Sequence, residues 1–167
     1  RPSGRSGSAL PHSVMLAFAF VRTQHRVQII LGALPYAKLV PKLKEEGVTH
    51  VLNMVAEWGG PEKEYEKYGI IQKRIPVIDF SPPSVADIQE GAEFVSQVVN
   101  EGGTVYVHCK AGRGRSASVC MGYLMKEKGM TPLAAQQLLT SKRPHVLHVL
   151  HQRPVILDLA TKLGQRL

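Results

Sequence analysis

The chain has 167 residues, 44% of them hydrophobic, so it suits one domain with a single core rather than a disordered chain. Its two cysteines are too few for a disulfide-stapled secreted fold, and we expect both to be thiols. The formal charge of +8 favours an anionic partner, which charge alone leaves as a phosphorylated substrate, an acidic lipid surface or nucleic acid.

The beginning of the chain is basic around an apolar centre, and its first acidic residue is Glu45. Arginine- and serine-rich segments without acidic residues resemble organelle transit segments, and a disordered basic tail is the alternative. The apolar run 14–21 is too short to span a bilayer but could rest on an anionic membrane surface. We therefore expect residues 1–26 to form a targeting or membrane-proximal leader and residues 27–167 to form the domain.

The first half of the domain alternates apolar segments with turns. Three segments predict strands, at residues 27–31, 49–55 and 69–77. A helix is expected over residues 36–46, ending at Gly47. Residues 57–61 are rich in turn formers and predict a loop.

The second half has clearer helix boundaries. Ser84 and Asp87 predict a capping box at the start of a helix that ends at residues 102–103. A short strand is expected over 104–107, then helices over 116–128, from Pro132 to before Pro144, and over 154–167. Alternating strands and helices predict an α/β fold with a central, mostly parallel sheet flanked by helices.

The segment His-Cys-Lys-Ala-Gly-Arg-Gly-Arg-Ser, residues 108–116, carries the chemistry. It joins a predicted strand to a predicted helix, an arrangement whose backbone N–H groups and helix dipole bind phosphate. Gly112 and Gly114 allow unusual backbone angles, and Arg115 can grip two phosphate oxygens with its planar fork. We expect residues Lys110, Ala111, Gly112, Arg113 and Gly114 to bind substrate.

Cys109 is the predicted nucleophile. The cationic, helix-end environment lowers a thiol pKa, so Cys109 would attack phosphorus as a thiolate and form a phosphocysteine intermediate. Ser116 can donate a hydrogen bond to the sulfur and ease its departure. His108 is expected to support the loop by hydrogen bonding. The alternative is that Cys109 is a buried structural cysteine.

The leaving alkoxide or phenoxide needs a proton, and Asp79 is the predicted general acid because it ends a strand before a proline-rich loop. The alternative is a surface turn aspartate. Asp87 is the competing acid, but its capping position already gives it a structural role.

Other chemistry-bearing residues are assigned simpler roles. Cys120 is expected in the helix core, with a redox partnership to Cys109 as the alternative. His145, His148 and His151 are expected to be structural or exposed, and no metal or cofactor is predicted because no metal-ligand spacing is present.

With these residues in hand, the chain resembles the dual-specificity branch of the protein-tyrosine phosphatases, and within it the mitochondrial lipid phosphatases of cardiolipin synthesis. The resemblance lies in residues 30–35, 51–54, 105–116 and 129–144. It implies a phosphatase of phosphatidylglycerophosphate associated with the mitochondrial inner membrane, with an anionic phospholipid as substrate. The basic residues Lys110 and Arg113 suit a polyanionic headgroup, unless they point to solvent.

The pattern departs from the family in two places. The loop after Asp79 is shorter than in some members, which puts the register of the acid in doubt. Residues 57–61 replace an acidic, aromatic loop, and we expect them to border the pocket without assigning a contact.

Several other functions stay open. The same fold could act on phosphotyrosine or phosphoserine/threonine in proteins, or on phosphoinositides, in the cytoplasm. A pseudophosphatase would lack the cysteine, the arginine or the acid, and all three are present. No nucleic-acid-binding signature supports a nucleic-acid partner.

Overall fold

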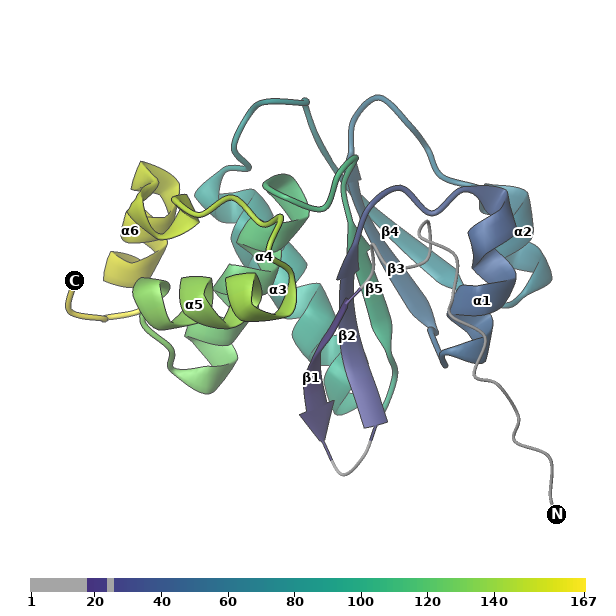
Figure 1. The fold of residues 1–167 in the computed structure, drawn as a ribbon, viewed down its shortest axis with the longest axis horizontal. Helices are drawn as coiled ribbons and strands as arrows, with labels where there is room; N and C mark the ends of the chain where they lie inside the picture. Colours follow the sequence, from purple (N-terminus) through teal and green to yellow (C-terminus); the bar gives the residue numbers. More distant parts are fainter. Residues whose placement is uncertain (1–17, 24–25) are drawn as a thin grey trace, which may run out of the picture.

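A five-stranded sheet divides the molecule into two layers of helices (Figure 1). The computed structural model describes residues 18–23 and 26–167. The strand order is β1-β2-β5-β3-β4, and β2, β5, β3 and β4 run parallel while β1 is antiparallel to β2. The strands are β1 (Phe18–Thr23), β2 (Arg26–Gly32), β3 (His50–Val55), β4 (Ile71–Val77) and β5 (Val105–His108). The predicted α/β class with a mostly parallel sheet is confirmed.

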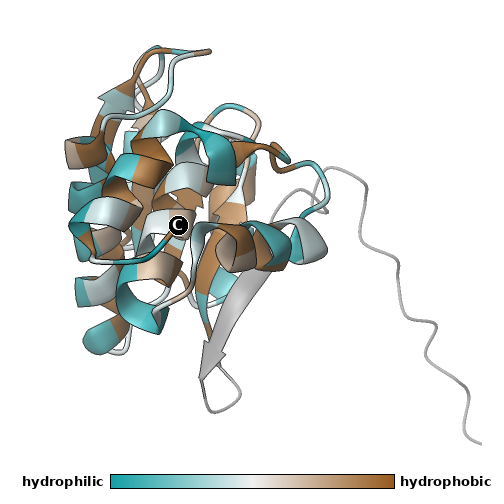
Figure 2. Cartoon of the chain, turned by 90° about the vertical axis from the view of Figure 1, so that its left-hand side faces the viewer, coloured by the Kyte–Doolittle hydropathy of each residue, from teal (hydrophilic) through white to brown (hydrophobic). Residues whose placement is uncertain are grey.

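The helices divide unequally between the two faces. One face carries α1 (Val40–Glu45), which follows the 3-10 turn η1 (Ala37–Leu39), and α2 (Glu62–Lys67). The other carries α3 (Val85–Asn100), α4 (Arg115–Lys128), α5 (Pro132–Lys142) and, after the 3-10 turn η2 (Leu150–Gln152), α6 (Pro154–Lys162). Figure 2 shows hydrophilic and hydrophobic residues mixed along the helices of this thicker layer.

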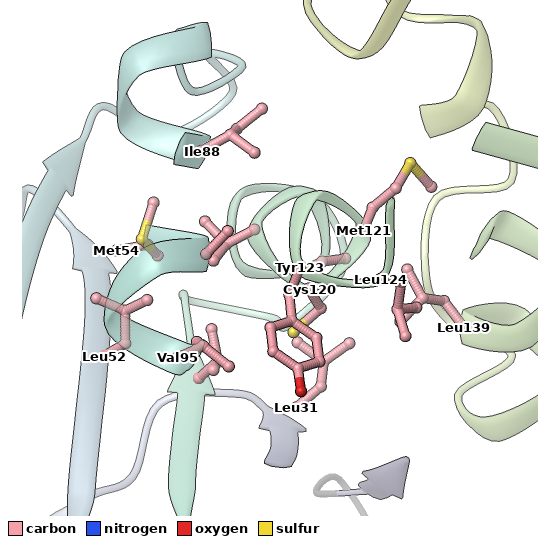
Figure 3. Packing of buried hydrophobic residues seen from close by; sticks show 14 of the residues in the cluster. Leu31, Leu52, Met54, Ile88, Val95, Cys120, Met121, Tyr123, Leu124 and Leu139 are labelled. Atoms are coloured by element: carbon pink, nitrogen blue, oxygen red, sulfur yellow. The ribbon is translucent and has the colours of Figure 1, made fainter. Parts of the chain in front are cut away.

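The main core lies between the sheet and α3–α6. Leu31 and Leu52 reach it from the sheet, and Val95, Cys120 and Leu124 reach it from α3 and α4 (Figure 3). A smaller cluster packs on the opposite face around Tyr65 and Tyr106. Because α4 is almost wholly buried, packing holds its N-terminal end firmly at the carboxyl end of the central strand β5.

Several predicted boundaries agree with the structure. Ser84 and Asp87 form the capping box of α3, and Thr131 caps α5 ahead of Pro132. Gly129 ends α4 in the left-handed conformation, with a φ of 63° that favours glycine.

The predicted leader needs correction. β1 lies inside residues 1–26 and pairs with β2 from Phe18↔Leu31 to Thr23↔Arg26, so the sheet starts before residue 27. Residues 18–21 of the apolar run therefore belong to a strand, which shares its apolar, aromatic composition with a membrane-surface segment. Residues 1–17 and 24–25 of the predicted leader lie outside the described residues.

The predicted helices also differ in detail. The helix expected over 36–46 is split into η1 and α1, with a proline near the start of α1. Helix α2 was not predicted, because Tyr65 is its one buried residue in an otherwise polar turn. The last helix ends at Lys162 rather than at residue 167.

Candidate active site

The loop 109–114 joins β5 to α4 at the carboxyl end of the central strand. The loops that follow β3 and β4 lie at the same end of the sheet (Figure 1). Carboxyl ends of parallel strands meet at one edge, and ligands of open α/β sheets bind there. The fold thereby gathers segments around residues 57, 79 and 109, which are far apart in the sequence.

Cys109 opens this loop and is 3% exposed. Its Sγ accepts hydrogen bonds from the backbone N–H of Gly112 at 3.2 Å and from Ser116 Oγ at 3.1 Å. Burial by itself raises the pKa of the thiol, but bonds from the Ser116 side chain and from the backbone N–H groups of Ser116, Gly112 and Arg113 outweigh it. The pKa of Cys109 therefore lies below that of an ordinary thiol, which favours the thiolate.

The curled loop is held from behind by Arg143, which the sequence analysis did not single out. Its buried guanidinium donates to the carbonyl oxygens of Gly112 at 3.0 Å and Ala111 at 2.8 Å. Gly112 has a φ of 66°, and a Cβ there would collide with the carbonyl of Gly32. The carbonyls that would repel a phosphate are thus turned away and neutralised by Arg143.

The segment after β2 supports the loop from the other side. Leu34 N donates to the Lys110 carbonyl at 3.2 Å, and Tyr106 Oη donates to the Ala33 carbonyl at 2.7 Å. Gly32 leaves room for the Tyr106 ring, where any Cβ would overlap it. These contacts fix the position of the loop relative to the segment that follows β2.

Arg115 is the first residue of α4 and is 5% exposed. Its Nη1 donates to the Val77 carbonyl at 2.8 Å and to Glu57 Oε2 at 3.1 Å. Its Nη2 donates to Glu57 Oε1 at 3.2 Å and to Asp79 Oδ1 at 3.1 Å. The guanidinium is therefore held in one orientation, and Arg115 and Cys109 line one cleft at this end of the sheet.

Asp79 follows β4 and faces the loop as predicted, although the sequence left its register in doubt. Besides pairing with Arg115, its Oδ2 lies 3.6 Å from Lys110 Nζ. Its Oδ1 also accepts from the backbone N–H of Phe80 at 3.0 Å. Phe80 has a φ of 62°, unusual outside glycine, which marks a strained turn at the rim of the site.

Glu57 is a site residue that the sequence analysis placed near the pocket without a contact. Its carboxylate pairs with both terminal nitrogens of Arg115. The hydrogen bonds from Arg115 lower the pKa of Glu57 and outweigh the opposing effect of burial, so the carboxylate is favoured in its ionised form. Glu57 could have been predicted, because it comes two residues after β3, at the same edge as Cys109.

His108 lies fully buried at the end of β5, between Trp58 and Tyr106 at ring distances of 6.1 and 5.8 Å. Its Nδ1 lies 3.2 Å from the Cys109 carbonyl. Burial lowers its pKa to about 4, so the ring is neutral at physiological pH. The ring therefore lies against the backbone of the loop at Cys109.

A cleft of about 400 Å³ opens over Cys109. Its lining includes the predicted loop residues Lys110, Ala111, Arg113, Gly114 and Arg115, while Gly112 is buried behind them. It also includes residues that sequence reasoning missed, namely Phe80, Ser81, Leu147 and Arg153.

The remaining candidates lie elsewhere. Cys120 is fully buried in α4, and burial raises its pKa, in keeping with a core residue. His148 contacts the Pro144 carbonyl and His151 contacts Gln136. No cluster of three metal-ligating side chains occurs in the part of the chain that the structure describes.

Residues 29–160 match the family model described as dual specificity phosphatase, catalytic domain. The chain belongs to the dual specificity phosphatase family. The predicted nucleophile Cys109, the arginine Arg115 and the acid Asp79 all lie within the matched residues.

Several similar relatives within the family are named as phosphatases of phosphatidylglycerophosphate. The chain is 43% identical over 122 residues to the phosphatidylglycerophosphate phosphatase PTPMT1 of Arabidopsis thaliana and 41% identical over 131 residues to PTPMT2 of the same plant. These matches cover 71% and 77% of the chain but 36% and 58% of the two relatives. A human phosphatidylglycerophosphatase and protein-tyrosine phosphatase 1 is 30% identical over 86% of the chain and 74% of its own length.

Solved structures agree with the fold. A crystal structure of PTPMT1 in complex with PI(5)P superposes with a TM-score of 0.73 at 28% identity, covering 82% of this chain and 92% of that one. Human DUSP28 gives a TM-score of 0.65 at 29% identity, covering 81% and 86%. The arrangement of sheet and helices is therefore shared with both PTPMT1 and DUSP28.

Proposed function

We propose that this protein hydrolyses phosphatidylglycerophosphate to phosphatidylglycerol and inorganic phosphate. The observation that carries the proposal is the composition of the cleft. Cys109, whose thiol has a lowered pKa, lies beside the fixed guanidinium of Arg115, and further basic side chains line the same cleft. The names of the plant and human relatives support this lipid as the substrate.

In the first step, the Cys109 thiolate attacks phosphorus. The S–P bond forms while the bond from phosphorus to the glycerol oxygen breaks, and protonated Asp79 gives its proton to the leaving alkoxide. The backbone N–H groups of the loop and the fork of Arg115 stabilise the charge on the phosphoryl oxygens. To reach that geometry, the phosphoryl group takes the hydrogen bond from Arg115 Nη2 that Asp79 accepts in the free protein.

In the second step, water attacks the phosphocysteine. The Asp79 carboxylate takes a proton from the water, a new O–P bond forms and the S–P bond breaks. Ser116 donates to the departing sulfur, since its Oγ already lies 3.1 Å from Sγ. Cys109 is returned as the thiolate and phosphate leaves, so no cofactor is consumed.

The charge of the cleft favours a headgroup with more than one anionic group. Lys110, Arg113 and Arg153 line it together with Arg115, while Asp79 is the acidic residue of the lining. A phosphotyrosine needs Arg115 and the backbone donors. The additional cations suit a phospholipid headgroup.

The rim of the cleft supports docking on an anionic membrane surface. Phe80, which lines the cleft, is 99% exposed, and Ile78 two residues before it is 71% exposed. Val149, which is 53% exposed, lies in the sequence between the lining residues Leu147 and Arg153. Apolar side chains beside lysine and arginine are the combination that binds the headgroup region of acidic bilayers. In the described residues, no helix is long and apolar enough to cross a membrane. An association with the mitochondrial inner membrane is part of the proposal and rests on the family resemblance.

The proposal is tested by phosphate release from several substrates in parallel. Purified protein would be given phosphatidylglycerophosphate vesicles, phosphoinositide vesicles, and phosphotyrosine and phosphoserine peptides, with Cys109→Ser as the inactive control. We expect the highest kcat/KM on phosphatidylglycerophosphate and no turnover by Cys109→Ser. A higher kcat/KM on a phosphopeptide would replace the substrate, and turnover by Cys109→Ser would remove the nucleophile assignment.

A further inference from the structure

Two arginines line the cleft without an acidic partner. Arg115 pairs with Glu57 and Asp79, and Lys110 lies near Asp79. Arg113 and Arg153 form no ion pair among the described residues. Arg113 and Arg153 are therefore the positively charged side chains of the cleft that no carboxylate in the described part of the chain neutralises.

The segment between α5 and α6 brings the two arginines to one cleft. Leu147 N donates to the Arg113 carbonyl at 3.0 Å, and Leu147 and Arg153 both line the cleft. Arg113 Nε donates to the His145 carbonyl at 2.9 Å, which fixes the direction of its guanidinium while its terminal nitrogens remain available. Arg153 is half-buried, and its guanidinium has no hydrogen bond within the described residues.

Two guanidinium groups that face one cleft without an acidic partner among the described residues hold positive charge that an anionic ligand in the cleft can neutralise. The phosphate that is cleaved does not need it. The loop N–H groups and Arg115 already supply the donors that a transferring phosphoryl group requires. A second anionic group on the same substrate is the remaining candidate.

Phosphatidylglycerophosphate has such a group. Its glycerol carries the monoester phosphate at one end and, three carbons away, the phosphodiester that joins it to the diacylglycerol. We propose that Arg153, together with Arg113, binds this second phosphate while Arg115 holds the monoester phosphate over Cys109. The inference rests on the proposed function and assigns Arg153 as a specificity-determining residue for the second phosphate.

The first arm of the test compares two soluble substrates that differ in the second phosphate. Steady-state kinetics would be measured on dioctanoyl phosphatidylglycerophosphate and on glycerol 3-phosphate, which carries the monoester alone. We expect Arg153→Gln to lower the ratio of kcat/KM for the lipid to kcat/KM for glycerol 3-phosphate about tenfold, as for a lost charge-assisted hydrogen bond. Arg153→Lys keeps the charge without the fork and should fall between the two proteins.

The matched control is Lys162→Gln, which removes one positive charge from the exposed end of α6 and should leave the ratio unchanged. Arg153 precedes α6 but makes no side-chain capping bond, so Arg153→Gln should keep its thermal midpoint within a few degrees of wild type. An unchanged ratio, or an equal fall for both substrates, would overturn the second-phosphate site.

The second arm does not depend on turnover or on the identity of the natural substrate. Calorimetry on Cys109→Ser would compare glycerol 1,3-bisphosphate with glycerol 3-phosphate. We expect the bisphosphate to have the lower dissociation constant. Adding Arg153→Gln should reduce the ratio of the two dissociation constants about tenfold. No advantage, or an Arg153 effect confined to the dioctanoyl lipid, would overturn the site. If phosphopeptides prove the better substrates while this arm succeeds, the proposed function fails and the second anion site stands.

Discussion

The carboxylate of Glu57 holds both terminal nitrogens of Arg115, at 3.1 and 3.2 Å, before any substrate is bound. The Val77 carbonyl adds a third fixed contact at 2.8 Å. Arginine loses rotamer entropy when it is ordered, and here the protein has already ordered it. Glu57 therefore acts as a positioning residue for the phosphate-binding fork.

We expect Glu57→Gln to lower kcat/KM about tenfold on aryl phosphates, because a charge-assisted pair that orients Arg115 is replaced by a weaker one. Glu57→Asp keeps the charge but shortens the reach, so it should lose nearly as much. Steady-state kinetics on p-nitrophenyl phosphate would measure both. A gain in kcat/KM for Glu57→Gln would instead mean that Glu57 competes with the phosphate more than it orients the arginine.

Asp79→Asn tests the general acid. An alkoxide needs a proton to leave and a nitrophenolate hardly does, so kcat should fall about 100-fold on glycerol 3-phosphate and less than tenfold on p-nitrophenyl phosphate. The lost pairing with Arg115 and Lys110 affects both substrates alike, so the ratio of the two losses isolates proton transfer. The control is Asp87→Asn, which weakens the cap of α3 and should lower the thermal midpoint without changing that ratio. Equal losses on both substrates for Asp79→Asn would remove Asp79 as the acid.

The fold class and the catalytic loop could be predicted because their signals are local. Cys109, Arg115 and the two glycines lie within one short segment whose spacing has a direct physical meaning. Arg143 and Arg153 could not be found in this way, since they approach the loop through a turn between helices and resemble surface residues in the sequence. Strand β1 was missed because an apolar edge strand and a membrane-surface segment have the same composition.

The hydrogen bond from Ser116 to Cys109 should control the pH at which the thiolate forms. Ser116 contributes to lowering the pKa of Cys109, so Ser116→Ala should move the midpoint of iodoacetamide alkylation to higher pH. Thiolate increases as pH rises through the pKa, so the variant should lose more activity at pH 6 than at pH 8. Ser118→Ala is the matched control, because the Ser118 hydroxyl donates to the Gly114 carbonyl instead of the sulfur. A midpoint shared by Ser116→Ala and wild type would contradict the assignment.

Buried His108 should make the protein less stable in acid. Burial lowers its folded pKa to about 4, whereas an unfolded histidine titrates near 6.5. Between these values the unfolded chain binds a proton that the folded chain does not, so stability falls as the pH falls from 6.5 to 4, by about 3 kcal/mol in all.

Urea unfolding at pH 7 and pH 5 would measure this effect. His108→Gln should have a lower free energy of unfolding than wild type at pH 7. Between pH 7 and pH 5, however, its free energy of unfolding should fall by about 2 kcal/mol less than that of wild type. His50, whose pKa burial also lowers, remains in both proteins and cancels in the difference. Identical pH dependence in the two proteins would show that His108 titrates normally in the folded state.

The exposed apolar rim should matter on vesicles more than in solution. Ile78 is 71% exposed beside the acid loop, and burying such a side chain in a bilayer contributes about 1.5–3 kcal/mol. Ile78→Ser should therefore weaken sedimentation with vesicles containing anionic phosphatidylglycerol about tenfold. It should also lower the ratio of turnover on vesicle-bound phosphatidylglycerophosphate to turnover on the dioctanoyl form.

The control for this prediction is Leu133→Ser, which removes a 51% exposed leucine just after the start of α5. The 14 residues of α4 separate the start of α5 from the cleft by about 20 Å, so Leu133→Ser should bind vesicles like wild type. Vesicles of phosphatidylcholine alone should bind both variants and wild type weakly, because Lys110, Arg113 and Arg153 then have no anionic surface to meet. If Leu133→Ser weakens binding as much as Ile78→Ser, the membrane contact is a general effect of surface hydrophobicity and the rim of the cleft has no special part in it.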